Sequence, residues 1–238
     1  MHKKKYSIIL PSYKESDNLK VLLPKLIKTA DQFLLSYEVI VVDACKSLDE
    51  TQKVCELHNV IYLNRSPRNV YGDAVRTGIQ RAKGELIIFM DSDGSHPPEF
   101  LSEMTQYVDH YDLLIASRYV KGGVTENNMP LVFMSRVLNL IYSKLLKINC
   151  YDISNSFRVY RHNQLELLTL HCDNFDIIQE ILFSLIGKNP NLKIKEIPFS
   201  FKKRIFGKSK RSMVIFIVSY FKTLMKLFWQ YRIMKFYS

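Results

Sequence analysis

The chain has 238 residues, of which 47% are hydrophobic and 24% charged. This composition suits one globular domain with a sizeable core and excludes a disordered chain. The formal net charge is +11, yet the residues before position 200 hold 24 basic against 23 acidic side chains. The remaining ten basic residues follow position 200, with no acidic residue among them. This part of the chain is expected to meet an anionic partner, either nucleic acid, phospholipid or a phosphorylated substrate.

The first half of the chain alternates short apolar runs with amphipathic helical patterns. Strands are predicted at Ser7–Leu10, Glu38–Asp43, Val60–Leu63, Leu86–Asp91 and Asp112–Ser117. Helices are predicted between them at Asn18–Phe33, Asp49–Leu57, Val70–Ala82 and Pro98–Val108. This alternation predicts an α/β fold with a mostly parallel central sheet flanked by helices, whose ligands bind outside the carboxyl ends of the strands.

The second half of the chain continues the same domain, because it contains no repeat, low-complexity segment or clear linker. Its predicted elements are a helix near Met134–Leu146, a polar segment at Asp152–Arg158, helices around Asn163–Leu170 and Ile177–Ile186, and a strand at Lys193–Ile197. The basic tail follows.

The cysteines and the N-terminus indicate the cellular setting. The four cysteines include no Cys-x-x-Cys pair, and no two histidines have ligand spacing, which argues against a zinc site or a disulfide framework. A reducing cytosol is the simplest setting. The apolar run Tyr6–Leu10 is broken at Pro11 and is too short for the core of a signal peptide.

Two carboxylates, Asp91 and Asp93, follow the apolar run Leu86–Met90. Oxygen ligands at a strand end can hold Mg²⁺ or Mn²⁺ together with substrate phosphates. Such a cation neutralises a diphosphate and improves it as a leaving group. The alternative is that both residues form an Asx-turn or a helix cap ahead of Pro97.

The segment from Asp91 to Glu99 resembles the Asp-x-Asp-x-x-His-Pro-Pro-Glu motif of family 2 glycosyltransferases, in particular the dolichyl- or polyprenyl-phosphate mannose synthases. Further segments resemble this family in the same order along nearly the whole chain. They are Pro11–Asn18, Glu38–Asp43, Gly72–Ala74 with Gly78 and Ala82–Gly84, Ser117–Gly123, Asp152–Tyr160 and Arg204–Lys210. The resemblance implies a GT-A-type nucleotide-sugar-binding domain that uses Mg²⁺ or Mn²⁺ and inverts the anomeric carbon.

The chain also departs from the family pattern at four places. Ala44 follows Asp43 where the family usually has a second acidic residue, and Gly94-Ser95 replaces Leu-Gln after the metal motif. Asn155-Ser156 replaces Ser-Gly before Phe157, and Leu131-Val132 stands where arginines often precede Ser135-Arg136. These departures leave the identities of donor and acceptor open.

The resemblance assigns roles to the polar residues at the strand ends. Tyr13 and Glu15, with Pro11, would bind the nucleoside, and Asp43 its base or ribose; alternatively Pro11 and Tyr13 only shape a loop. Arg118 would face the donor or acceptor phosphate, because a planar guanidinium suits phosphate oxygens. Arg136 is a second candidate for phosphate binding, unless it lies on a solvated helix face.

The segment Arg204–Lys210 is predicted to be a mobile basic loop that closes over the diphosphate and the lipid phosphate, with Arg204 and Lys210 as catalytic residues. It is not a P-loop, because the first glycine of that motif would fall at Lys202. The alternative is a solvated run of charge. No histidine is needed as a base, since a phosphate monoester is already ionised near neutral pH, with a second pKa of about 6.

The tail is expected to be a basic amphipathic helix. No stretch after Met213 reaches the roughly 20 apolar residues that a spanning helix needs. At helical spacing Arg211, Ser219, Lys222, Lys226 and Gln230 form a polar stripe. The opposite stripe contains Tyr220, Leu224, Leu227, Phe228 and Tyr231. Such a helix suits an anionic membrane interface. The alternatives are a helix that packs on the core and one that docks on a small membrane partner subunit.

We therefore expect residues 1–210 to form the glycosyltransferase domain and 211–238 a membrane-associating helix. The expected reaction transfers a hexose, mannose from GDP-mannose being favoured, to a polyprenyl or dolichyl phosphate at the cytoplasmic face of a membrane. One alternative is a UDP-sugar-dependent enzyme that acts on a polyprenyl phosphate or a saccharide. Another is a non-catalytic module that binds a nucleotide or anionic lipid. Nucleic acid is not an expected partner.

Overall fold

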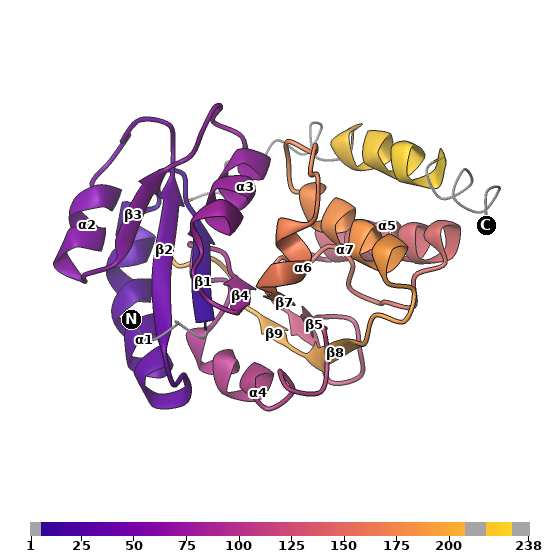
Figure 1. The fold of residues 1–238 in the computed structure, drawn as a ribbon, viewed down its shortest axis with the longest axis horizontal. Helices are drawn as coiled ribbons and strands as arrows, with labels where there is room; N and C mark the ends of the chain where they lie inside the picture. The colour runs from indigo at the N-terminus through magenta and orange to yellow at the C-terminus, as the bar shows by residue number, and fades with distance from the viewer. Residues whose placement is uncertain (1–5, 208–217, 230–238) are drawn as a thin grey trace.

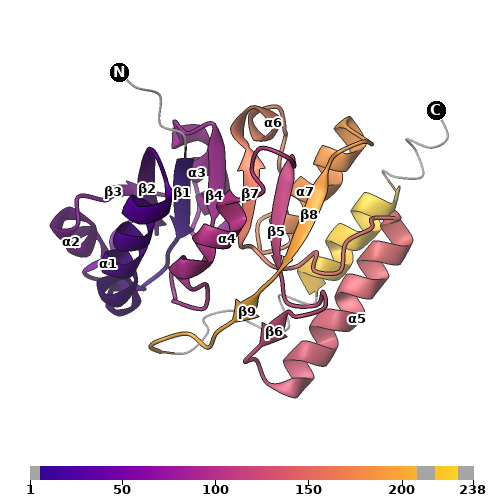
Figure 2. The same ribbon diagram turned by 90° about the horizontal axis from the view of Figure 1, so that it is seen from below.

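The computed structural model describes residues 6–207 and 218–229. Its main sheet has seven strands in the order β3-β2-β1-β4-β7-β5-β8, and helices cover both faces (Figures 1 and 2). The strands are β1 (Tyr6–Pro11), β2 (Tyr37–Asp43), β3 (Ile61–Asn64), β4 (Leu86–Phe89), β5 (Leu113–Ser117), β7 (Arg158–Arg161) and β8 (Ile194–Pro198). β6 (Val124–Thr125) and β9 (Ser200–Phe201) form a separate parallel pair. The predicted α/β class and its mostly parallel sheet are confirmed.

The helices divide between the two faces. The helical elements are α1 (Ser16–Phe33), α2 (Thr51–Leu57), α3 (Tyr71–Arg81), the 3-10 turn η1 (Pro98–Phe100), α4 (Leu101–Thr105), α5 (Met129–Leu146), α6 (His162–Glu166) and α7 (Ile177–Lys188). Residues 218–229 are also helical. One core cluster joins the sheet to α1, α2 and α4, and the other joins it to α3, α5, α6, α7 and the 218–229 helix.

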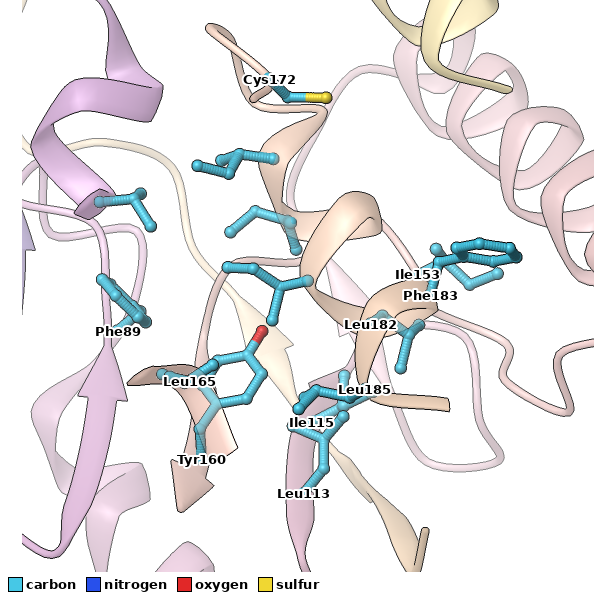
Figure 3. Close-up of a cluster of buried hydrophobic side chains, with 14 of the residues drawn as sticks. Phe89, Leu113, Ile115, Ile153, Tyr160, Leu165, Cys172, Leu182, Phe183 and Leu185 are labelled. Carbon is cyan, nitrogen blue, oxygen red and sulfur yellow. The ribbon is translucent and has the colours of Figure 1, made fainter. Parts of the chain in front are cut away.

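Alternation along the central strands supplies both cores. In β1, Ile9 packs into the second cluster while Ile8 and Leu10 pack into the first, as the two-residue period of a strand requires. Figure 3 shows the second cluster, where Phe89 and Tyr160 from neighbouring strands meet side chains of α7. Because both faces of these strands are buried, polar residues such as Asp43 and Arg158 lie at the ends of their strands.

β7 is the strand of the main sheet that the sequence analysis does not predict; the short pair β6 and β9 is not predicted either. The four residues of β7 lie between β4 and β5 and run antiparallel to both, with Phe89 opposite Arg158. The predicted polar segment at Asp152–Arg158 shares only Arg158 with this strand, and the two apolar residues that follow, Val159 and Tyr160, are too short a run to signal a strand. The insertion brings residues 152–157 beside the ends of β4 and β5.

Several predicted boundaries also differ. The predicted helix at Pro98–Val108 is the turn η1 followed by the short helix α4, and the predicted helix at Asn163–Leu170 ends at Glu166. The helix predicted from Met134 begins at Met129, with Pro130 in its first turn, where a missing N–H costs nothing.

Candidate active site

The Asp91–Asp93 loop follows β4 at the carboxyl edge of the sheet. Its middle residue, Ser92, is buried and donates from Oγ to the Pro11 carbonyl at 2.9 Å. The side chains of Asp91 and Asp93 are about one quarter exposed, at 25% and 24%. Both line a cavity of about 700 Å³. The loop is thus anchored in the sheet while its carboxylates remain open to a ligand.

Each of these carboxylates accepts a hydrogen bond on its Oδ1. Oδ1 of Asp91 accepts a hydrogen bond from Ser156 Oγ at 2.9 Å, and Oδ1 of Asp93 accepts one from the Ser95 N–H at 3.0 Å. Among residues 6–207 and 218–229 no cluster of three or more His, Cys, Asp or Glu could hold a metal ion. The pair does fit Mg²⁺ or Mn²⁺ bound through one or two carboxylates plus substrate phosphates.

His96 is fully buried and fixes the position of the Asp91–Asp93 loop. Its Nδ1 accepts the Asp91 N–H at 2.9 Å, so the proton is on Nε2, which lies 3.2 Å from Oδ1 of Asn155. The ring stacks on Phe157 at 4.9 Å between centroids. Burial lowers the pKa of His96 below its usual value, despite the nearby carboxylates. The imidazole is therefore neutral and both its nitrogens are occupied, which excludes it as a metal ligand in this arrangement.

Arg118, at the end of β5, makes a buried ion pair with Asp152. Its Nε and Nη2 each lie 2.7 Å from a carboxylate oxygen, and the Arg118 N–H donates to Oδ2 at 2.9 Å. Nη2 also donates to Ser154 Oγ at 2.8 Å. Burial alone would raise the pKa of Asp152, but the charge and hydrogen bonds of Arg118 lower it below its usual value. The guanidinium lines the cavity and also fixes the 152–156 loop beside Asp91.

A second arginine, Arg158, supports the 152–156 loop from the interior of the domain. Arg158 is fully buried, donates from Nε to the Asn155 carbonyl at 2.8 Å and donates from Nη2 to the Ile153 carbonyl. It therefore satisfies carbonyls that no strand or helix pairs. Neither this role nor the Arg118–Asp152 pair is visible in a sequence pattern, because the partners are brought together by the antiparallel β7.

The expected nucleoside side of the site lies at the ends of β1 and β2. Asp43 is buried, and its Oδ2 accepts the Tyr62 hydroxyl at 3.2 Å. Its Oδ1 makes no hydrogen bond of normal geometry with a described residue. Burial raises the pKa of Asp43, although hydrogen bonds from Ala44 and Tyr62 oppose the shift. Pro11 and Tyr13 occupy the end of the adjacent strand and its loop, and neither they nor Asp43 line the cavity.

Arg65, which the sequence analysis did not select, supports this edge. It is buried and donates to the carbonyls of Asp43, Ser12 and Val70. Its guanidinium carbon lies 5.9 Å from the centroid of the Tyr13 ring. The only signal in the sequence is an arginine two residues after the apolar run Val60–Leu63. The residue holds two strand ends together, so that Tyr13 and Asp43 keep fixed positions.

Residues 202–207 cover the Asp91–Asp93 loop. The N–H of Ile205 donates to the Asp93 carbonyl, and that of Lys202 to the Ser95 carbonyl, both at 3.0 Å. Gly94 permits this approach: its φ is +81°, and a Cβ there would lie 2.4 Å from Cδ1 of Ile205. The departure from the family pattern at Gly94 therefore has a structural use, since it makes room for the covering segment.

Arg204 joins this covering segment to the start of α1. Its Nη2 lies 2.9 and 2.7 Å from the two carboxylate oxygens of Glu15, and its Nη1 lies 3.7 Å from Oδ2 of Asp93. Asn18 Oδ1 accepts the Phe206 N–H at 2.8 Å. Glu15, expected at the nucleoside, is thus paired with Arg204. Lys210, the other expected catalytic residue of this loop, lies outside the described residues.

The structure brings four of the expected residues to one cavity, namely Asp91, Asp93, Arg118 and Arg204. Lys202 and Lys203 add two further basic side chains to its wall, which also contains Glu126, and the Nζ of Lys202 lies 2.9 Å from Oε1 of Glu126. Arg136 is exposed and does not line the cavity, and its guanidinium carbon lies 5.4 Å from the centroid of the Tyr119 ring. Its expected role in phosphate binding therefore has no support from the cavity.

Paired carboxylates beside a basic cavity, at the carboxyl edge of a mostly parallel sheet, are the arrangement expected of an enzyme that handles a diphosphate. Residues 7–168 match the description Glycosyl transferase family 2. The chain belongs to this family of glycosyltransferases, as its motifs predict.

Relatives of known name include two at 30% identity. Dolichol-phosphate mannosyltransferase of Pyrococcus furiosus aligns over 215 residues, which cover 87% of this chain and 59% of that protein. Polyprenol monophosphomannose synthase of Mycolicibacterium smegmatis aligns over 217 residues, 86% of this chain and 80% of that protein. The chain thus spans about three fifths of the archaeal relative. Dolichol-phosphate mannosyltransferase of Saccharomyces cerevisiae is 26% identical over 94% of this chain and 86% of its own length.

Solved structures of similar fold include glucosyl-3-phosphoglycerate synthase of Mycobacterium tuberculosis. Its complex with Mn²⁺, UDP and glucosyl-3-phosphoglycerate has a TM-score of 0.72 and 15% identity, covering 94% of this chain and 80% of that one. Its complex with Mg²⁺ and UDP has a TM-score of 0.73 and 16% identity, covering 94% and 79%. This likeness confirms the GT-A-type fold.

Proposed function

We propose that this glycosyltransferase transfers mannose from GDP-mannose to a polyprenyl or dolichyl phosphate, with inversion at the anomeric carbon. The observation that carries the proposal is the composition of the cavity. Asp91, Asp93 and Glu126 line it together with four basic side chains, and α5 contributes Leu131 and Met134. A cavity with acidic, basic and apolar parts suits a cation, two phosphate groups and the start of a lipid chain. The names of the relatives at 30% identity support this acceptor class.

The proposed roles follow from the geometry. Asp91 and Asp93 would hold Mg²⁺ or Mn²⁺, whose charge would make the diphosphate a better leaving group. Arg118, Lys202 and Lys203 place positive charge on the cavity wall, where an acceptor phosphate would be positioned for attack. An ionised phosphate oxygen needs no base, and this agrees with a His96 whose nitrogens are both engaged.

The nucleoside is proposed to bind at Pro11, Tyr13 and Asp43. Asp43 offers a buried carboxylate oxygen without a normal hydrogen bond, which a ribose hydroxyl or a base N–H would satisfy. Glu15 would join them once Arg204 releases it. The assay below compares two bases, because some of the similar solved structures contain UDP whereas the named relatives are mannosyltransferases.

The setting that we propose is the cytoplasmic face of a membrane, with peripheral attachment. The ten basic residues after position 200 and the lipid-linked acceptor both favour it. Attachment through a small membrane partner subunit is the alternative.

The test is transfer of radiolabelled sugar to a short polyprenyl phosphate that is soluble in water. Lipid-extractable product should form from GDP-mannose with Mn²⁺, and EDTA should abolish it. Asp93→Asn should remove activity by at least a hundredfold while its thermal unfolding stays unchanged. Asp17→Asn is the matched control, because Asp17 is 73% exposed on α1. Product from a UDP-sugar in place of GDP-mannose would refute the donor, and full activity in EDTA would refute the metal site.

A further inference from the structure

The start of α3 lies just behind the candidate active site. The first residue of this helix, Tyr71, stacks its ring on Phe175, with 4.0 Å between the ring centroids and 18° between the ring planes. Phe175 lines the cavity together with Asp91 and Ser156. The ring of Tyr71 is therefore one layer behind the cavity wall.

The hydroxyl oxygen of Tyr71 is buried and makes no hydrogen bond of normal geometry with a described residue. Burial raises the pKa of this hydroxyl well above its usual value, the negative charge of Asp91 raises it further, and contact with Ser156 opposes the shift. The group thus stays a protonated phenol that can donate one hydrogen bond. Buried donors without an acceptor are rare and costly in native structures.

Ser156 is an acceptor of the right kind for this hydroxyl. Its Oγ donates its single hydrogen to Oδ1 of Asp91 at 2.9 Å, which leaves the lone pairs of the same oxygen able to accept. A hydrogen bond from Tyr71 to this oxygen would complete a chain that runs from Tyr71 through Ser156 to Asp91. Successive hydrogen bonds in a buried site polarise and strengthen one another. The Asp91 carboxylate would then keep one orientation in the cavity.

The backbone beside Tyr71 is fixed by the loop that precedes α7. The N–H of Gly72 donates to the Asp173 carbonyl at 2.8 Å, and a Cβ at Gly72 would collide with the carbonyl oxygen of Cys172. Only glycine permits so close an approach of two backbones. The glycine of this family motif thus holds Tyr71 where its ring meets Phe175.

The loop that carries Phe175 is held in turn by the 218–229 helix, because Asp176 accepts a hydrogen bond from the Thr223 hydroxyl. The same helix turns inward the apolar stripe that was expected to face a membrane. The residues of this stripe that are at most 5% exposed and belong to the core cluster are Tyr220, Leu224 and Leu227. Their expected orientation is therefore corrected: they pack on the domain and support the loop.

We propose that Tyr71 is a positioning residue for the candidate metal site: its hydroxyl donates to Ser156 Oγ when a cation occupies the site, and so fixes the orientation of the Asp91 carboxylate. Tyr71 touches neither substrate nor cation and acts through Ser156 alone. The inference rests on the proposed function, since it adds a residue to the metal site of that reaction.

The test is the affinity of the full chain for Mn²⁺, measured by electron paramagnetic resonance in the presence of GDP and, separately, of UDP. Tyr71→Phe keeps the stacked ring and removes only the hydroxyl. It should weaken Mn²⁺ binding by about fivefold, which is less than the loss typical of a group that contacts a metal ligand directly. Its Tm should not fall, because the hydroxyl that it removes is a buried donor without a normal hydrogen bond.

Tyr142→Phe is the matched control for the loss of a hydroxyl. Tyr142 is buried in the neighbouring core cluster, and its hydroxyl donates to the Tyr220 carbonyl. This variant should lower Tm, because it leaves a buried carbonyl without its donor, and should leave Mn²⁺ affinity unchanged. The two variants thus separate an effect on the metal site from an effect on the fold.

A double-mutant cycle tests the route through Ser156. Tyr71→Phe combined with Ser156→Ala should bind Mn²⁺ no more weakly than Ser156→Ala alone, because Tyr71 acts only through the serine. Fluorotyrosine in place of Tyr71 supplies a spectroscopic signature. Its fluorine NMR resonance should shift when Mg²⁺ and nucleotide bind, and Ser156→Ala should reduce that shift.

Three outcomes would overturn the inference. They are an unchanged Mn²⁺ affinity in Tyr71→Phe, an equal loss of affinity in Tyr142→Phe, and losses that multiply in the double variant. Absence of Mn²⁺ binding by the unaltered chain would overturn it together with the proposed metal site. None of these measurements uses turnover. Activity on the soluble acceptor, and its loss in Asp93→Asn, therefore tests the proposed reaction independently.

Discussion

The buried pair of Arg118 and Asp152 permits a quantitative prediction. Asp152 is fully buried and the Arg118 side chain is 9% exposed, with two contacts of 2.7 Å between them. Arg118→Met leaves the carboxylate buried without its partner, which should cost about 3–5 kcal/mol of unfolding free energy near pH 7. For a chain of this size that is a fall in Tm of roughly 6–20 °C. Urea titration followed by circular dichroism measures the loss.

The same variant should change how stability depends on pH. In the wild type the pKa of Asp152 is lowered, so the stabilisation is fully present above the unfolded value of about 3.9 and is lost as pH falls through the lower folded value. Without Arg118, burial is the largest remaining influence and raises this pKa. The variant then takes up a proton more readily as pH falls. The stability gap to the wild type should therefore narrow from about pH 7 to about pH 5.

A double variant provides the control. Arg118→Met with Asp152→Asn removes the unpaired charge and should recover at least half of the lost stability, because replacing both partners of a buried pair is far less costly than breaking it. A single variant as stable as the wild type at neutral pH, or a double variant no better than the single one, would refute this account of the 152–156 loop.

Three further predictions concern the loop, the covering segment and the tail. Ser156→Ala removes the hydrogen bond to Asp91 and should weaken Mn²⁺ affinity in the presence of nucleotide by about tenfold, as measured by electron paramagnetic resonance; unchanged affinity would contradict it. Arg204→Ala should lower kcat more than it weakens nucleotide binding, since it releases the covering segment from Glu15; collapsed nucleotide affinity with unchanged turnover would exclude a lid. Truncation after Arg211 should lower Tm markedly, because Tyr220 and Leu224 belong to the core; a truncated protein with full thermal stability would show that the helix is dispensable for the fold.

Much of the fold could be predicted from local sequence. Buried parallel strands are continuous apolar runs, so β1, β2 and β4 were recognisable, and the polar residues that end them necessarily meet at one edge. The order of the motifs then predicted the family. The spacing of Asp91 and Asp93, with one residue between them after a strand, was enough to place both carboxylates in one loop. These properties depend on residues near one another in the chain.

The tertiary structure determined the contacts between residues that are far apart in the sequence. The antiparallel β7 turns the 152–156 loop toward β4, and only this insertion joins Arg118 to Asp152 and Ser156 to Asp91. A helical pattern likewise shows that two stripes exist, but not which of them faces the core. Tyr220 faces inward because α5 and α7 offer it an apolar surface. Side-chain orientation is fixed by the packing of whole elements, and that information is not present in any single segment of the sequence.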